Sequence, residues 1–324
     1  MTDDEPILKK SNKRFTAFPI IYQDLWYFKK LQEDSIWKAS EIDYVSDIQS
    51  WNSLGPDDQK FIENILAFFA GADGIVMENI DINFSSEVQI AEARIFYSLQ
   101  NYIEGVHSET YALLLDTFVK DPIRKDHLFN AIDNIPCIQK KAKWCQKWMS
   151  NDKPFATRLV AFAFVEGIYF SGAFCSIFWL KNRKVCLNAL CKSNEFISRD
   201  EQIHCNFAIA LYKHLNKKIT KTEFYKMLKE AVAIESEFIT EALPCRLIGM
   251  NSNLMIQYIK FVSDHWTVKF GFPKLYNVDN PFPFMDLMAL DSKTNFFEQR
   301  VTEYPKLDNS SLPTASNIQI TEDF

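Results

Sequence analysis

Glycine is scarce in this chain, with 8 residues in 324, and few glycine-rich turns of the kind that separate β-strands are present. We find no alternation of strand and helix patterns, and no repeat of fixed short period. These absences argue against β-sandwiches, β-barrels and α/β folds. The sequence therefore predicts an all-α fold.

The sequence also lacks the signals of several locations and partners. Its first residues, MTDDEPILKKSNKRF, contain no apolar stretch like that of a signal peptide. The seven cysteines are odd in number and none is spaced as CxxC, which favours reduced thiols in a cytoplasmic protein. A net charge of −6 and a pI near 5.5 argue against a nucleic-acid partner.

A single long apolar run needs its own explanation. Residues 159–180 contain one ionisable carboxylate, Glu166, and are bracketed by Arg158 and Lys181. About 20 apolar residues suffice to cross a bilayer, but a lone acid there costs roughly 2.5–3.5 kcal/mol. The run is either a membrane span or a buried helix in which a metal or another cation compensates Glu166. A mean hydropathy of −0.17 is typical of soluble proteins.

Hydrophobic periodicity predicts a single domain of long helices. Between residues 57 and 80, Phe61, Ile65, Phe68 and Phe69 recur at spacings of three and four. Pro56 and the aspartates after it form a typical helix start. Further long helices are expected over residues 87–119, 158–182 and 221–244.

The two ends of the chain differ in composition from the rest. Residues 1–16 are polar and of mixed charge, so we expect a flexible segment there, before a helical domain over residues 17–290. The segment 291–324 ends in LDNSSLPTASNIQITEDF, which has little to bury. This end is either a frayed terminus or a tail that orders when it docks on a partner.

Two of the five histidines follow a glutamate by three residues, in EGVH (Glu104, His107) and EQIH (Glu201, His204). On a helix, residues i and i+3 are about 60° apart around the axis and about 4.5 Å apart along it. A carboxylate and an imidazole at this spacing can therefore bind the same ion. One copy would be explained by a surface hydrogen bond, but two copies favour a metal site.

Two further acids lie in largely apolar helices, Asp73 in FFAGADGIV and Glu166 in FAFVEGIYF. One acid from each of two helices and one Glu-x-x-His from each of two more is the pattern of ferritin-like dinuclear metal proteins, with Asp73 where a glutamate is usual. Four carboxylates and two imidazoles suit iron or manganese. A metal would also explain a buried Glu166.

Tyr111 follows His107 by four residues and therefore lies on the same face of its helix. Phe170 and Phe174 follow Glu166 by four and eight residues, and Ile197 precedes Glu201 by four. These side chains would surround the phenol with apolar groups, as a stable radical requires. An ordinary core tyrosine is the alternative.

With these residues in place, the sequence resembles the small subunit of class I ribonucleotide reductase, of the eukaryotic and large-DNA-virus kind. The resemblance runs from about residue 14 to the C-terminus. It includes AFFAGADGIV, EARIFYSLQNYIEGVHSETYALLL, VEGIYFSGAFCSIFWLK, NEFISRDEQIHC, EALPCRLIGMN and KTNFFEQRV.

The resemblance implies two iron ions per subunit in a di-iron-oxo centre. One ion would be held by Asp73, Glu104 and His107, and the other by Glu166, Glu201 and His204. Reaction with oxygen would leave a stable radical on Tyr111. Ribonucleotides would be reduced to deoxyribonucleotides on a separate large subunit.

The resemblance also implies a route for the radical. Asp200 would hydrogen-bond both Trp37 and His107, with Arg199 beside them, and Tyr304 would pass the radical across the subunit interface. Ile318, Ile320 and Phe324 would dock on the large subunit, although many eukaryotic members carry phenylalanine and leucine at the first two positions. A homodimer is expected, in the cytoplasm, or in the host cytoplasm if the protein is viral.

Three alternatives follow from the same residues. Another dimetal protein is the first, such as an iron store, a desaturase-like oxidase or a manganese–iron relative. A store would not need Tyr111 together with Trp37 and Asp200, and the manganese–iron relatives usually carry phenylalanine where this chain has Tyr111. A non-enzymatic paralogue would lack metal ligands, whereas all six are present. A membrane protein would leave both Glu-x-x-His pairs unexplained, so no membrane is expected.

Overall fold

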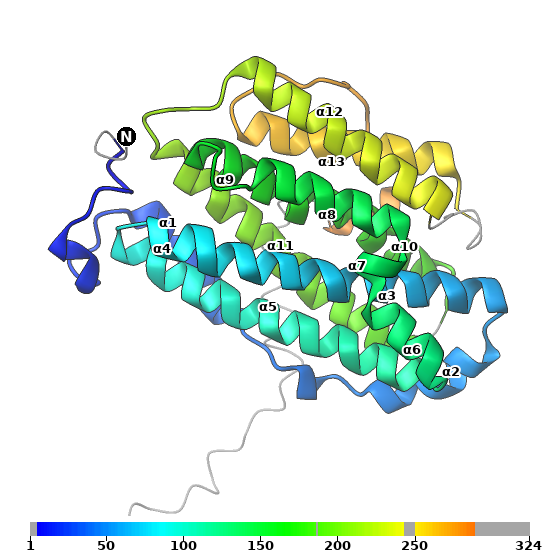
Figure 1. Cartoon of the computed structure of the whole chain (residues 1–324). Helices are drawn as coiled ribbons and strands as arrows, with labels where there is room; N and C mark the ends of the chain where they lie inside the picture. Colours follow the sequence, from blue (N-terminus) through cyan, green and yellow to red (C-terminus); the bar gives the residue numbers. More distant parts are fainter. Residues whose placement is uncertain (1–4, 186, 243–249, 289–324) are drawn as a thin grey trace, which may run out of the picture. The chain divides into compact units, whose positions relative to one another are not determined.

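The computed structural model describes residues 5–185, 187–242 and 250–288, and within these ranges its regular elements are all helices (Figure 1). The all-α, ferritin-like fold predicted from the sequence is confirmed. The α-helices are α1 (Gln23–Asp34), α2 (Ile48–Ser53), α3 (Pro56–Asn79), α4 (Ser85–Glu87), α5 (Ala91–Phe118), α6 (Pro122–Phe129), α7 (Ala131–Asn134), α8 (Pro136–Trp148), α9 (Phe155–Phe164), α10 (Ser171–Asn182), α11 (Asn188–Lys213), α12 (Lys221–Glu237) and α13 (Ser252–Lys269). Three π-helices are η4 (Ile80–Phe84), η5 (Val165–Tyr169) and η6 (Phe238–Ala242), and short 3₁₀-helices are η1 (Asn12–Phe15), η2 (Ala39–Glu41), η3 (Tyr44–Asp47) and η8 (Pro283–Met288).

The chain divides into two compact units, Met1–Asp286 and Leu287–Phe324. In the first unit, Glu5 accepts hydrogen bonds from the backbone N–H groups of Asn216 and Lys217, each at 2.7 Å, and Ile7 is buried. Of the second unit, only the last residues of η8 are described. The division into segments 1–16, 17–290 and 291–324 stays a prediction.

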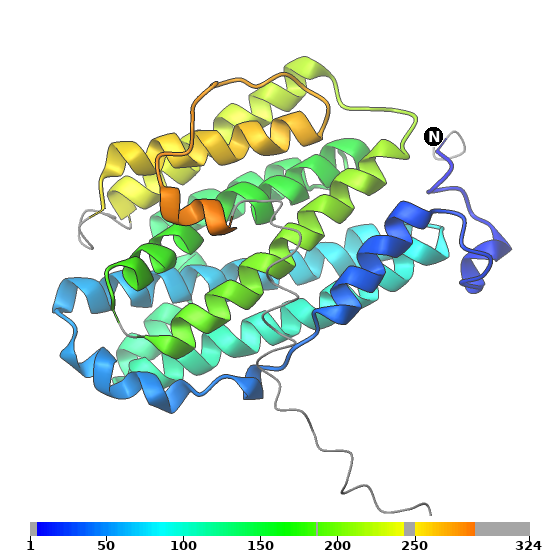
Figure 2. The ribbon, with the colours of Figure 1, turned by 180° about the vertical axis from the view of Figure 1, so that it is seen from behind.

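Several helices of the first unit surround its interior. Helix α3 packs along α5, and α11 packs against α9, α1 and α5. In Figure 2, which shows the protein from behind, α1 and α11 lie in front. Helices α12 and α13 pack on each other, and α12 also contacts α8 and α9. The elements that carry the predicted metal ligands therefore meet in one interior region.

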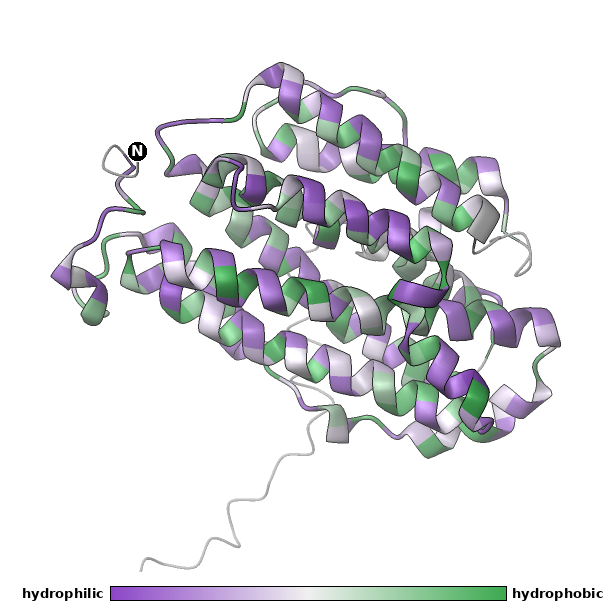
Figure 3. Ribbon diagram, in the orientation of Figure 1, coloured by the Kyte–Doolittle hydropathy of each residue, from purple (hydrophilic) through white to green (hydrophobic). Residues whose placement is uncertain are grey.

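The apolar run lies inside this bundle. Phe155–Asn182 is long and apolar enough to cross a membrane, yet its apolar window is completely buried in the protein. Arg158 forms two hydrogen bonds with Glu87, at 2.6 and 2.7 Å, and Lys181 pairs with Glu195. By contrast, Figure 3 shows hydrophilic and hydrophobic residues interspersed along the outer helices α5 and α12. The apolarity of the run is thus explained by burial within the protein.

Two of the expected helices are interrupted. The helix expected over residues 158–182 is α9 followed by π-helix η5 and then α10, and the helix expected over 221–244 gives way to π-helix η6 after Glu237. A π-helix inserts an extra residue in a turn and is frequent at functional sites. Hydrophobic periodicity cannot reveal η5, because the residues around Glu166 are apolar or small and are buried on all sides of the helix.

Candidate metal centre

Six side chains that the sequence singled out as ligands meet in the interior of the bundle. Asp73 comes from α3, Glu104 and His107 from α5, Glu166 from η5, and Glu201 and His204 from α11. Each is at most 2% exposed. Because α5 and α11 are regular at these positions, each Glu-x-x-His pair lies on a single helix face, with the glutamate facing its own histidine.

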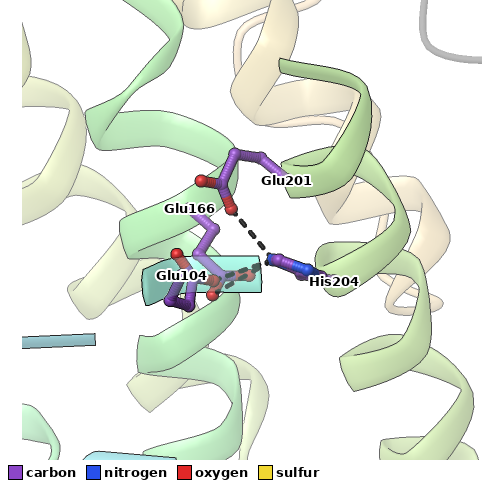
Figure 4. A group of neighbouring side chains, drawn as sticks. All are labelled: Glu104, Glu166, Glu201 and His204. Carbon is purple, nitrogen blue, oxygen red and sulfur yellow. Dashed lines mark hydrogen bonds and ion pairs between the residues drawn. The ribbon is translucent and has the colours of Figure 1, made fainter. Parts of the chain in front are cut away.

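The potential ligand atoms form two groups that share one residue. The ligand atoms of Asp73, Glu104 and His107 lie within 4.8 Å of one another, and so do those of Glu104, Glu166, Glu201 and His204. Figure 4 shows the second group, with the side chains from three elements converging on one point. Two adjacent ions sharing Glu104 would therefore account for both groups.

Two glutamates lie between the two imidazoles. Glu104 approaches Nδ1 of His107 at 3.3 Å and Nδ1 of His204 at 3.0 Å. Glu201 approaches the same two nitrogens at 3.3 and 3.1 Å. Asp73 belongs to the His107 group alone, whereas Glu166, at 3.9 Å from Nδ1 of His204, belongs to the other. Glu104 and Glu201 would therefore be within reach of both ions, whereas Asp73 and Glu166 would each serve one.

Several polar atoms of the cluster lack partners in the described part of the chain. Both oxygens of Asp73, Oε2 of Glu166 and Nε2 of His204 are buried without a hydrogen bond. Buried polar atoms are nearly always satisfied in native proteins, so these exceptions indicate that something else binds here. Carboxylate and imidazole donors in a dry pocket fit iron or manganese.

The electrostatics of the cluster point to the same conclusion. Burial, reinforced by the neighbouring carboxylates, raises the pKa of Asp73 and Glu166 well above the usual range. Burial also opposes the charge of Glu104, yet contacts with His204 and His107 lower its pKa to about 2. So many buried carboxylates cannot all be ionised together unless positive charge compensates them, which a metal would supply.

A buried hydrogen-bonded network leads away from His107. Oδ2 of Asp200 lies 3.2 Å from Nε2 of His107 and accepts a hydrogen bond from Nε1 of Trp37 at 2.8 Å. Arg199 donates to Oδ1 of Asp200 at 3.1 and 3.0 Å, and Gln32 donates to the same oxygen at 3.3 Å. Although burial disfavours its charge, Arg199, His107 and Trp37 hold the pKa of Asp200 well below its usual range.

Tyr111, also on α5, lies in an aromatic pocket. Its side chain is 2% exposed, its hydroxyl has no hydrogen-bond partner among the described residues, and burial raises its pKa well above the ordinary value. Phe69 stacks on its ring at 4.7 Å, and Phe174 and Phe170 pack on Phe69 at 5.0 and 5.5 Å. Ile197 is completely buried on α11. Water is therefore excluded from the phenol.

Comparison with known proteins identifies the family. The family model for ribonucleotide reductase, small chain, matches residues 14–281. The sequence is 54% identical to a ribonucleoside-diphosphate reductase small chain of Arabidopsis thaliana, an alignment that covers 94% of this protein and 89% of the plant protein. It is 52% identical to the small chain of Variola virus, over 94% and 95%. The chain belongs to the ribonucleotide reductase small-chain family.

A solved structure agrees with this assignment. The ribonucleotide reductase Rnr4 homodimer from Saccharomyces cerevisiae superposes with a TM-score of 0.82 at 36% identity, covering 93% of each chain. The family predicted from the sequence motifs is thus confirmed, and with it the function and the enzyme class. Small chains of ribonucleoside-diphosphate reductase generate the radical that a large subunit uses to reduce ribonucleotides.

The sequence did not reveal every residue of this small-chain site. Phe69 was part of the helical periodicity, but nothing marked it as the ring that stacks on Tyr111. Gln100 donates to Oε1 of Glu166 at 2.9 Å, and its position one turn before Glu104 could have placed it on the ligand face. No sequence signal pointed to Gln32.

Four predicted residues cannot be placed. Tyr304, the proposed interface residue, and the tail residues Ile318, Ile320 and Phe324 lie outside the described residues. Their roles stay predictions.

Proposed function

We propose that the six buried ligands bind two iron ions, one at Asp73, Glu104 and His107 and the other at Glu166, Glu201 and His204. The observation that carries this proposal is that Glu104 and Glu201 each approach both imidazoles within a dry cluster. Reduced iron, together with dioxygen, would supply the oxidising power that removes an electron from Tyr111. The protein itself fixes the ligands and excludes water.

In this proposal Tyr111 carries the stable radical. Its hydroxyl, which has no hydrogen-bond partner among the described residues, and the stacked Phe69 leave the ring in an apolar setting. Phe170 and Phe174 pack on Phe69, and Ile197 would complete the pocket. Solvent reductants cannot reach a phenol that is 2% exposed. Burial thereby protects the radical once it has formed.

We further propose that the radical leaves through His107, Asp200 and Trp37. A carboxylate that orients a ligating imidazole also fixes its tautomer. Asp200 does this for His107 while accepting the indole hydrogen bond, and Arg199 holds Asp200 in its charged form. Tyr304 would continue the route to the large subunit.

The assembly proposed is a homodimer that works with a large subunit in the cytoplasm, or in the host cytoplasm if the protein is viral. The homodimer of the yeast relative supports the dimeric assembly. The odd number of cysteines, none spaced as CxxC, supports a cytoplasmic location. The tail residues Ile318, Ile320 and Phe324 would dock on the large subunit, with an affinity that depends on the branched aliphatic side chains of Ile318 and Ile320.

Low-temperature electron paramagnetic resonance (EPR) tests the metal and radical proposals together. We expect metal-free protein, loaded anaerobically with ferrous iron and then exposed to oxygen, to bind two irons per subunit and to give a tyrosyl doublet. The doublet should be absent before oxygen is added. Bound iron without a radical would instead favour an oxidase, an iron store or a manganese cofactor, and a protein that binds no metal would contradict the site.

Deleting residues 318–324 tests the docking tail. We expect the truncated protein to form the radical normally, because the residues that hold the metal and Tyr111 are untouched. Turnover with the large subunit should be lost, since the segment that orders on binding is gone. A matched variant with Ile318 and Ile320 replaced by alanine should fall between the two. Full turnover by the truncated protein would contradict the docking role.

A further inference from the structure

The π-helix that carries Glu166 is held by side chains from other helices. Three consecutive carbonyls of η5 accept side-chain hydrogen bonds. Trp266 Nε1 donates to Gly167 O at 3.0 Å, Ser171 Oγ to Ile168 O at 2.7 Å, and Lys141 Nζ to Tyr169 O at 2.9 Å. Trp266 belongs to α13 and Lys141 to α8, so η5 is clamped from two directions outside its own helix.

Lys141 is an unusual residue to find in this position, because it is 3% exposed and surrounded by aromatic rings. Its ammonium lies 3.8 Å from the ring centre of Phe68 and 3.6 Å from that of Phe238. Its partner is Glu235 of α12, at 2.5 Å, which is completely buried. Buried ion pairs are often no more stabilising than apolar residues of similar size, so stability alone does not account for this one.

Two glycines in the same segment make room for these partners. A Cβ atom on Gly167 would lie 2.6 Å from Nε1 of Trp266, and one on Gly172 would lie 2.5 Å from Oε1 of Glu235. Neither contact is possible for a larger residue without displacing the donor or the carboxylate. The glycines at positions 167 and 172 thus permit the close approach of both Trp266 and the Lys141–Glu235 pair.

Resting on the proposed metal function, we propose that Trp266 and the Lys141–Glu235 pair are positioning residues that hold η5 in its wide turn, so that Glu166 faces the metal ligands. None of the three belongs to the groups of potential metal ligands. They act through carbonyls one and three residues beyond Glu166. A π-helix holds one residue more in its turn than an α-helix does. If this wide turn formed elsewhere along the helix, Glu166 would be rotated about the helix axis by roughly 100°, since an α-helix turns once in 3.6 residues. The carboxylate would then leave the cluster.

Gln100 also helps to hold Glu166, but it contacts the carboxylate and not the backbone. It holds Oε1 of Glu166, whereas Trp266 and Lys141 hold the backbone that carries this side chain. One hydrogen bond at the tip of a glutamate cannot fix the phase of its helix. The backbone contacts are therefore the part of the support that decides where the side chain points.

The first test replaces Trp266 with phenylalanine, which removes the indole N–H and keeps an aromatic ring. Trp144→Phe is the matched control, because Trp144 is also buried and lies edge-on against Tyr169 at 5.2 Å, but its Nε1 has no hydrogen-bond partner among the described residues. Glu166→Gln serves as a reference that identifies the binding step to which Glu166 contributes. Metal-free proteins are titrated with Mn²⁺, with the free ion followed by EPR.

We expect two binding steps in the unmodified protein, one of which Glu166→Gln weakens most. Trp266→Phe should weaken that same step by roughly 10- to 100-fold, the usual effect of removing an outer partner of a ligand, and leave the other step within about threefold. Trp144→Phe should leave both steps unchanged. Equal effects of Trp266→Phe and Trp144→Phe, or equal weakening of both steps, would overturn the proposal.

A second variant tests the ion pair without leaving a lone buried charge. Lys141→Met with Glu235→Gln removes the hydrogen bond to Tyr169 O and keeps the site neutral and of similar volume. We expect the same selective loss of metal affinity, together with faster amide exchange over residues 165–174. Unchanged affinity and exchange would overturn the proposal for the pair. If the unmodified protein bound neither Mn²⁺ nor ferrous iron, the proposed metal function would fail first, and this inference with it.

Discussion

Tyr111→Phe is expected to bind two irons normally and to yield no stable radical and no turnover. The hydroxyl of Tyr111 has no hydrogen-bond partner among the described residues. Its removal therefore breaks no hydrogen bond with them and leaves the stacking on Phe69 intact. Phenylalanine cannot be oxidised to a phenoxyl radical. Metal content, EPR after oxygen and reductase activity with the large subunit measure the three effects.

A matched control is available on the same helix. Tyr97 of α5 is 1% exposed, and its hydroxyl also lacks a partner among the described residues. Tyr97→Phe removes the same atom from a similar environment and should retain both the doublet and turnover. A doublet that survives in Tyr111→Phe, or one that disappears in Tyr97→Phe alone, would place the radical on another residue.

Trp37→Phe is expected to preserve the radical on Tyr111 and to abolish its use by the large subunit. The substitution removes the hydrogen bond between Nε1 and Asp200, as well as an easily oxidised ring, and leaves the contacts of Asp200 with His107 and Arg199 in place. Positioned proton transfer contributes roughly 10²- to 10⁴-fold to a rate, and we expect turnover to fall by at least that amount. The doublet should be unchanged.

Trp51→Phe provides the comparison for this second variant. Trp51 is also buried, at 5% exposure, but it stacks on Phe118, and the hydrogen bonds described for Asp200 do not include it. It should retain turnover. Full activity of Trp37→Phe would exclude Trp37 from the radical route, and loss of the doublet would show that the residue acts in forming the radical and not in passing it on.

The sequence by itself determined the ligand types and their pairing along each helix. Glu104 with His107 and Glu201 with His204 share a helix face because the α-helix has a fixed number of residues per turn, whatever surrounds it. The isolated acids, Asp73 and Glu166, were recognisable because an ionised group in an apolar helix needs compensation. The helix start at Pro56 was also correct, since its signals are local.

Only the tertiary structure decided how these pieces meet. Which glutamates lie between the imidazoles, and which ring stacks on Tyr111, depend on how α3, α5 and α11 pack on one another. The π-helix at Glu166 is held by Trp266 and Lys141, whose contacts no local pattern encodes. Helix geometry is local and can be inferred from spacing, whereas the phase and approach of one helix against another are set by side-chain packing.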